Sequence, residues 1–207
     1  MSTATPRSTI SLQPQNRAPE SMQRIDTSIP GVLELRPALF QDARGFFIET
    51  YHRERFKSLG ITEEFVQDNH SRSTKGTLRG FHYQLHHAQA KLCRVVEGRV
   101  LDVALDIRVG SPSFGKWTAV TLCAETHNMI YIPPGFAHAF LALTDSVEFL
   151  YKCSDFYDRP DEHGIRWNDP ALGVNWGIAA PLVSEKDANL PALADVPRNL
   201  LPRFDAK

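Results

Sequence analysis

The clearest pattern in the chain is an alternation of side-chain character over residues 100–108. Apolar side chains occupy every second position of this segment, at Leu101, Val103, Leu105 and Ile107. A period of two residues is typical of a β-strand, because successive side chains point to opposite faces of a sheet. We therefore predict a strand over residues 100–108.

Short runs of β-branched and aromatic residues, separated by Gly, Pro and Asp, extend over most of the chain. They predict further strands at residues 32–36, 46–51, 78–84, 91–96, 116–122, 129–132, 137–143 and 147–152. One brief helix is predicted at residues 53–59, ended by Gly60. Many short strands with turn signals between them favour an all-β antiparallel sandwich or barrel with a few short helices.

A turn with the sequence Pro133-Pro134-Gly135-Phe136-Ala137-His138 narrows the fold. Proline fixes φ and glycine permits a tight reversal, so the turn delivers His138 to the start of the next strand. This turn resembles the P-x-G-x-x-H turn of the cupins, and Glu97-Gly98 fits their other hairpin. The resemblance implies a cupin-type jelly-roll β-barrel or sandwich.

Length and composition favour one globular domain. The chain has 207 residues, of which 42% are hydrophobic and 23% charged, as in an ordinary globular protein. Residues 1–22 are rich in Ser, Thr, Pro, Gln and Asn and show no apolar period, so we expect a disordered tail, with Met22 as an alternative initiator. Residues 23–207 are predicted to form a single domain.

Charge and cysteine content limit the partners and the compartment. A net charge of -1 provides no bulk attraction for nucleic acid or an anionic membrane, so an anionic ligand needs locally placed cations. No apolar run approaches the ~20 residues that span a bilayer. The three cysteines lack paired CxxC spacing and indicate neither a disulfide framework nor a structural zinc site. We expect a cytoplasmic protein without nucleic-acid or membrane partners.

Histidines raise the question of a metal. Many cupins use an H-x-H pair, but the corresponding segment here is His82-Tyr83-Gln84, which lacks the second histidine. A non-standard site built from His82, His86 and His138 is an alternative, because histidine suits zinc or iron where several ligands converge. We favour His86 and His87 in an exposed loop, and we predict no metal and no cofactor.

The segment around Gly80 brings a cation and a histidine close together in sequence. Strict alternation would send Arg79 and His82 to opposite faces, whereas a bulge at Gly80 would restore a common face. Lys91, Tyr151 and His138 lie on other predicted strands, and inward positions of several strands meet at the mouth of a closed barrel. Each of these residues, taken alone, also has a purely structural interpretation.

A series of motifs in order makes the interpretation specific. They are residues 42–51 (DARGFFIETY), 67–71 (QDNHS), 78–84 (LRGFHYQ), 90–92 (AKL), 102–108 (DVALDIR), 111–117 (SPSFGKW), 132–140 (IPPGFAHAF), 148–152 (EFLYK), 167–170 (WNDP) and 184–187 (SEKD). Together they resemble the dTDP-4-dehydrorhamnose 3,5-epimerase family from about residue 25 to residue 190.

The family's chemistry explains why such a site needs no cofactor. Members invert the two carbons that flank the ketone of a dTDP-4-keto-6-deoxyhexose. The ketone acidifies the neighbouring C–H bonds, because the carbanion that forms becomes an enolate. The reaction needs a base on one face, an acid on the other and a donor for the oxyanion.

The resemblance assigns these catalytic roles to four residues. His82 is the implied base, since imidazole titrates near neutral pH. Asp187 is its implied dyad partner, which orients and stabilises the imidazolium. Lys91 is expected to stabilise the enolate oxygen, and Tyr151 to return a proton from the opposite face.

Further matching positions are expected to bind the substrate. Arg79 and Arg44 are candidates for the diphosphate, because guanidinium groups match phosphate oxygens in a bidentate manner. By analogy, Arg44 reaches the site of the neighbouring subunit. The resemblance thus implies a homodimer with shared N-terminal strands.

The remaining binding candidates lie on either side of the catalytic set. Phe46 and Glu49 are expected at the nucleotide end, and Gln67 and Asn69 are candidates for reading the thymine edge. His138 is expected to lie beside the substrate rather than on a metal.

The chain departs from the family pattern where Ala139 follows His138 in place of the usual glycine, and Phe81 stands where leucine is common. We expect the Ala139 methyl group at the pocket wall, where it would affect substrate position or the choice of carbon. The main prediction is conversion of dTDP-4-dehydro-6-deoxy-D-glucose to dTDP-4-dehydro-L-rhamnose. The alternatives are a single-carbon epimerase on a related dTDP-4-ketosugar, a metal-dependent cupin enzyme and a non-catalytic sugar-nucleotide binding module.

Overall fold

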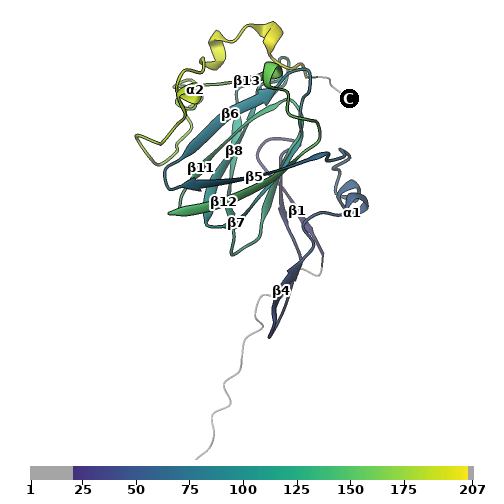
Figure 1. The fold of residues 1–207 in the computed structure, drawn as a ribbon. Coiled ribbons are helices and arrows are strands. Elements are labelled where there is room, and N and C mark those ends of the chain that lie inside the picture. Colours follow the sequence, from purple (N-terminus) through teal and green to yellow (C-terminus); the bar gives the residue numbers. More distant parts are fainter. Residues whose placement is uncertain (1–20, 205–207) are drawn as a thin grey trace, which may run out of the picture.

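Two facing antiparallel sheets form the body of the protein in the computed structural model, which describes residues 21–204 (Figure 1). The first sheet contains, in spatial order, β1 (Gln23–Asp26), β2 (Leu33–Arg36), β10 (Met129–Ile132), β7 (Lys91–Glu97), β12 (Ser146–Cys153) and β5 (Gln67–Thr74). The second contains β13 (Glu162–Gly164), β6 (Leu78–Gln84), β11 (Phe136–Ala142), β8 (Arg99–Asp106) and β9 (Trp117–Cys123). The predicted all-β sandwich is confirmed. The tail predicted over residues 1–22 falls almost wholly outside the described residues.

A separate hairpin and a few short helices complete the fold. The hairpin consists of β3 (Leu39–Asp42) and β4 (Gly45–Ile48), and it projects away from the two sheets (Figure 1). The helices are α1 (Arg53–Ser58), α2 (Glu185–Ala188) and the 3₁₀-helices η1 (Arg159–Asp161), η2 (Leu193–Asp195) and η3 (Arg198–Leu200). Within residues 21–204, every helix is too short or too polar to cross a bilayer.

The nine predicted strands correspond to β2, β4 and β6 to β12, with bounds that differ by at most three residues. The predicted helix corresponds to α1, whose N-cap His52 accepts a hydrogen bond from the Arg55 amide. Four strands, β1, β3, β5 and β13, and the helix α2 were not predicted. These elements are short or, like β5 with the sequence QDNHSRST, too polar to show an apolar period.

Both faces of the second sheet are covered, which explains its apolar composition. Side chains of β8 and β11 on one face, such as Val100 and Phe140, pack between the two sheets. Those on the other face, such as Val103 and Leu141, pack against the C-terminal segment around Trp176. Successive side chains of β8 therefore enter two different buried environments. Its polar residues Asp102 and Asp106 lie on the face that is turned toward the space between the sheets.

A bulge in β6 places two functional candidates on one face. His82 pairs with His138, and Arg79 pairs with Phe140, so two residues of β6 lie opposite the single residue Ala139. The extra residue restores the common face that strict alternation would deny, as predicted. Gly80 has φ of +111°, and an added Cβ would lie 2.4 Å from the carbonyl oxygen of His138.

The first prediction concerns this bulge. Gly80→Ala should lower the free energy of unfolding by about 3 kcal/mol, because it adds a steric clash to an unfavourable positive φ. Gly110→Ala is the matched control: its φ is +92°, but nothing lies within 4 Å of the added methyl group. We expect a loss of about 1 kcal/mol there. Urea denaturation measures both, and equal losses would contradict the close-contact argument.

Candidate active site

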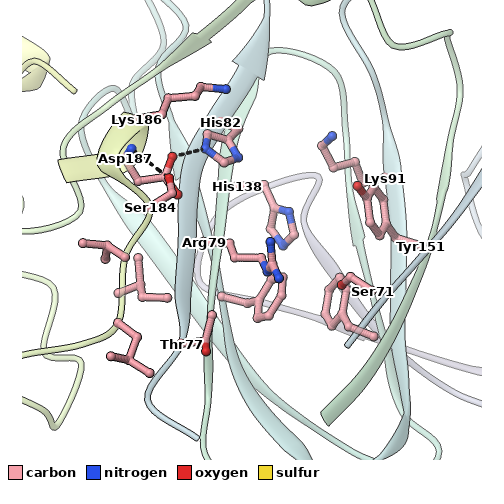
Figure 2. Close-up of a pocket in the computed structure, with 15 residues that line it drawn as sticks. Ser71, Thr77, Arg79, His82, Lys91, His138, Tyr151, Ser184, Lys186 and Asp187 are labelled. Atoms are coloured by element: carbon pink, nitrogen blue, oxygen red, sulfur yellow. Dashed lines mark hydrogen bonds and ion pairs between the residues drawn. The ribbon is translucent and has the colours of Figure 1, made fainter. Parts of the chain in front are cut away.

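A cleft opens beside β6 and between the two sheets (Figure 2). Its larger part, with a volume of about 570 Å³, is lined by Ser71, Thr77, Leu78, Arg79, His82, Lys91, His138, Phe140, Phe149, Tyr151, Leu182, Val183, Ser184, Lys186 and Asp187. An adjoining part of about 330 Å³ is lined by Gln67, Asn69, His82, Tyr83, Gln84, Gln89, Lys91, Tyr151, Cys153, Tyr157 and Glu162. The two parts share His82, Lys91 and Tyr151, which therefore lie at the middle of the cleft.

His82 and Asp187 form a hydrogen-bonded pair on one side of the cleft. The His82 Nε2 atom lies 2.6 Å from Oδ1 of Asp187, while the Gly80 amide donates to Oδ2 at 3.3 Å. Ser184 caps α2 by accepting a hydrogen bond from the Asp187 amide, which fixes the carboxylate beside the Nε2 edge of the ring (Figure 2). The pair joins a strand in the middle of the chain to a helix near its C-terminal end.

The environment of Asp187 keeps it ionised although it is only 3% exposed. Burial opposes the charged form, but the hydrogen bond and charge of His82, the Gly80 amide and Lys186 together hold the pKa of Asp187 below its ordinary value. An ionised carboxylate here orients the imidazole and stabilises its protonated form.

Lys91 and Tyr151 lie across the cavity from this pair (Figure 2). The Lys91 Nζ atom donates to Oε1 of Gln89 at 2.8 Å and lies 5.6 Å from the centre of the Tyr151 ring. Burial, followed by the neighbouring thiols of Cys153 and Cys93, raises the pKa of Tyr151 to about 12. The phenol therefore keeps its proton near neutral pH and can donate it.

A second histidine–aspartate pair lies deeper in the same cavity. The His138 Nε2 atom is 2.9 and 3.0 Å from the two carboxylate oxygens of Asp102, and both residues are buried. Cys93 is the third member of the one group of possible metal ligands that converges within residues 21–204. His138 Nε2 already has a hydrogen-bond partner in the Asp102 carboxylate, so we interpret the two residues as a hydrogen-bonded pair.

The alternative metal site of His82, His86 and His138 does not converge within the described residues. His82 is held by Asp187 and His138 by Asp102. The backbone amides of His86 and His87 instead donate to the buried carboxylate of Asp161, at 2.9 and 2.8 Å. The loop that carries these two histidines is thus fixed by Asp161.

The predicted binding residues divide between the cleft and the hairpin. Arg79 lines the larger part of the cleft, where its Nε donates to the Ser73 hydroxyl at 3.2 Å. Gln67 and Asn69 line the smaller part. The Gln67 amide is used within the protein at both ends, since it donates to Asn69 Oδ1 at 3.0 Å and accepts from the Tyr157 amide at 2.9 Å.

Arg44, Phe46 and Glu49 lie apart from the cavity that holds His82. Arg44 is on the hairpin, pairs with Asp42 at 2.6 Å and has a side chain that is 90% exposed. Phe46 is 59% exposed and packs on the His127 ring. Glu49, just after the hairpin, pairs with Arg55 at 2.8 Å. Within one chain, the fold does not bring these three residues to the other candidates.

Several residues of the cleft were not predicted. Glu162, on β13, forms an ion pair with Lys186 and accepts from the Tyr157 hydroxyl at 2.8 Å. Burial opposes its ionisation, but Lys186, Tyr157 and His82 hold the pKa of Glu162 below its ordinary value. Ser71 lies two residues after Asn69 on β5, and Phe149 lies two residues before Tyr151 on β12, so each side chain points to the same face as its neighbour. This period of two could have been used to predict both residues from the sequence.

The expectation for Ala139 was wrong. Its methyl group belongs to the apolar cluster on the outer face of β11, together with Ala137 and Leu141, and it does not line the cleft. The side chains of His138 and Phe140 point to the cavity, so strand alternation sends Ala139 the opposite way. The Ala139 methyl group therefore points away from the cleft and does not form part of its wall.

The second prediction follows from the Asp187 environment. The pKa of Asp187 is lower in the folded protein than the ~3.9 of an unfolded aspartate. The stability that this residue contributes is therefore present above about pH 4 and is lost as the pH falls through the folded value. The difference in free energy of unfolding between wild type and Asp187→Asn should be larger at about pH 5 than at about pH 3.

Urea denaturation at the two pH values measures this difference. Circular dichroism at pH 7 serves as the control that Asp187→Asn folds. An equal difference at both pH values would contradict an ionised, buried Asp187.

Known proteins are similar to this chain in sequence and in fold. The family model described as dTDP-4-dehydrorhamnose 3,5-epimerase matches residues 26–195. A dTDP-4-dehydrorhamnose 3,5-epimerase from Shigella flexneri is 51% identical over 170 residues, which cover 81% of this chain and 94% of that protein.

Two solved structures are similar to the whole sandwich. A dTDP-6-deoxy-D-glucose-3,5-epimerase from Legionella pneumophila, in complex with dTDP-4-keto-L-rhamnose, is 44% identical with a TM-score of 0.87, covering 89% of this chain and 100% of that one. ChmJ, a 3'-monoepimerase from Streptomyces bikiniensis in complex with dTDP-quinovose, is 38% identical with a TM-score of 0.80, covering 85% and 91%. The chain belongs to the dTDP-4-dehydrorhamnose 3,5-epimerase family of isomerases.

Proposed function

We propose that this chain converts dTDP-4-dehydro-6-deoxy-D-glucose to dTDP-4-dehydro-L-rhamnose by inverting C3 and C5. The observation that carries the proposal is the arrangement across one cavity: His82 backed by Asp187 on one side, Lys91 and Tyr151 on the other. These are the base, cation and acid that an enolate reaction requires. Shared membership with relatives named for this reaction supports the choice of substrate.

His82 performs the first step. Asp187 holds Nε2 of the ring, which leaves Nδ1 to accept the proton from the carbon beside the ketone. As the C–H bond breaks, its electron pair forms the C=C bond of the enolate and negative charge develops on the C4 oxygen. Asp187 stabilises the imidazolium, and the Lys91 ammonium stabilises the oxyanion.

Tyr151 completes the inversion. Its phenolic proton passes to the carbon on the face opposite His82, where the C=C electron pair forms the new C–H bond. An electron pair on the oxyanion re-forms the C=O bond at the same time. The tyrosinate then regains a proton from solvent and His82 releases one, so the site returns to its starting state. The same sequence at the second carbon gives the doubly inverted sugar. The raised pKa of Tyr151 ensures that the proton is present before the enolate forms.

The shape of the cleft supports an extended nucleotide sugar. We place the sugar between His82 and Tyr151, and the base in the smaller part near Gln67 and Asn69. The exposed Tyr157 ring stands at the rim of that part and offers an aromatic face. Arg79 supplies a local cation for the diphosphate in a chain with almost no net charge, whereas Lys186 is already paired with Glu162.

A single-carbon epimerase on a related dTDP-4-ketosugar is the second candidate. The structural similarity to the Streptomyces bikiniensis 3'-monoepimerase favours it. The two candidates share the base, the acid and the oxyanion donor. They differ in how many carbons of the bound sugar exchange protons.

The third prediction separates these candidates. Proton NMR of dTDP-4-keto-6-deoxyglucose with the protein in deuterium oxide should show deuterium entering at both C3 and C5. His82→Asn should abolish exchange at both carbons, because one base serves both, while dTDP affinity stays within a few fold. Exchange at only one carbon would establish the single-carbon epimerase. Retained exchange in His82→Asn would remove His82 from the mechanism.

We also propose a homodimer in which the hairpin reaches the second copy. Phe40, Phe46 and Phe47 are 56%, 59% and 67% exposed on this projecting hairpin, more apolar surface than an isolated two-stranded ribbon normally leaves in water. Covering them with a second copy would bring Arg44 to a site that already holds the catalytic residues. The family resemblance supports this arrangement.

The fourth prediction is subunit complementation. Co-expressed Arg44→Ala and His82→Asn chains form mixed dimers in which one site has both native residues. If pairing is random, half the dimers are mixed and each has one complete site, so about a quarter of wild-type turnover should return. Each variant expressed alone is the control. Activity no greater than that of the two variants measured separately would place Arg44 in its own chain's site.

We further propose that residues 23–207 act as one domain in the cytoplasm. All three cysteines are free, buried thiols. Such thiols are typical of proteins kept in a reducing compartment, which supports this location.

A further inference from the structure

We propose that Gln89 is a positioning residue, which aims the Lys91 ammonium into the cleft and leaves its positive charge uncompensated. The inference rests on the proposed function, since it assigns Lys91 to the developing enolate oxygen. Gln89 lies two residues before Lys91, in the segment that leads into β7, and it lines the smaller part of the cleft.

Two hydrogen bonds fix the Gln89 amide. Its Nε2 donates to the backbone carbonyl of Asp155 at 2.9 Å, and its Oε1 accepts from Lys91 Nζ at 2.8 Å. A carbonyl oxygen accepts only from the NH₂ end of the amide, so the Asp155 contact determines which end faces Lys91. The flexible lysine side chain is thereby held at its terminal atom, with two remaining N–H bonds available.

The neutrality of this partner matters for catalysis. Lys91 takes part in none of the ion pairs formed among residues 21–204. Glu162, which shares the smaller part of the cleft, is instead paired with Lys186 and the Tyr157 hydroxyl. A carboxylate at position 89 would hold the ammonium equally well but would offset the charge that the enolate oxygen needs.

Other contacts hold the Asp155 loop, so removing the Gln89 amide should not unfold the site. Gln84 donates to the Phe156 carbonyl at 3.1 Å and accepts from the Asp158 amide at 2.9 Å. Gln67 accepts from the Tyr157 amide. Variants at position 89 therefore test the contact with Lys91 in a cleft that keeps its shape.

The fifth prediction compares Gln89→Glu with Gln89→Met. Both variants lose the hydrogen bond to the Asp155 carbonyl, but only Gln89→Glu places a negative charge against Lys91. In deuterium oxide at neutral pH, Gln89→Met should exchange substrate protons about threefold more slowly than wild type. Gln89→Glu should be about 30- to 100-fold slower, approaching Lys91→Met. The affinity of both variants for dTDP should stay within about twofold of wild type.

The outcomes distinguish this inference from the proposed function. A wild-type protein without exchange on this substrate would overturn the proposed function itself. With an active wild type, equal rates for Gln89→Glu and Gln89→Met would show that Gln89 only fastens the loop, and the inference would fail while the function stands. A larger loss in Gln89→Glu, with unchanged dTDP affinity and unfolding temperature, would support the inference.

Discussion

The hydrogen bond between His82 and Asp187 is the interaction on which the site depends. It joins β6 to a four-residue helix 105 positions later in the chain. A helix of that length has little stability of its own. It is held by the Ser184 cap and by the packing of the C-terminal segment on the outer face of the second sheet. The catalytic pair is thus a product of tertiary structure, since neither residue lies near the other in sequence.

The same constraint explains the polar residues inside the sandwich. A sheet covered on both faces should be apolar throughout, yet Asp102 and His138 are buried within it and Asp187 is buried beside it. Each has a hydrogen-bond partner, so the cost of burial is offset locally. The bulge at Gly80 then turns Arg79 and His82 toward this polar region. Apolar clusters lie on both faces of the sheet around this polar region, and His82, Lys91 and Tyr151 line the open cleft beside it.

Sequence patterns predicted the strands that bury side chains, such as β6 and β8, because burial favours short runs of apolar, β-branched and aromatic residues. They missed β5, whose polar residues line the cleft or face solvent, so its alternation has no apolar signature. The role of Asp187 was predicted from the family resemblance alone. Its burial and its contact with His82 depend on the packing of α2, which lies far from His82 in the sequence. The direction of Ala139 could have been inferred, because it alternates with His138, which was already placed beside the substrate.

The charges in the cleft suit a reaction that creates and removes an enolate. Asp187 and Glu162 are carboxylates with lowered pKa values, Asp187 hydrogen-bonded to His82 and Glu162 paired with Lys186, whereas Tyr151 is a phenol whose pKa is raised. The Asp187 carboxylate can therefore stabilise the positive charge that His82 gains as the base. Tyr151, the acid, holds its proton before the reaction starts. Lys91 completes this division because its partner is a neutral amide. A site in which every cation had an acidic partner could bind the same sugar, but it would stabilise the negative oxygen far less.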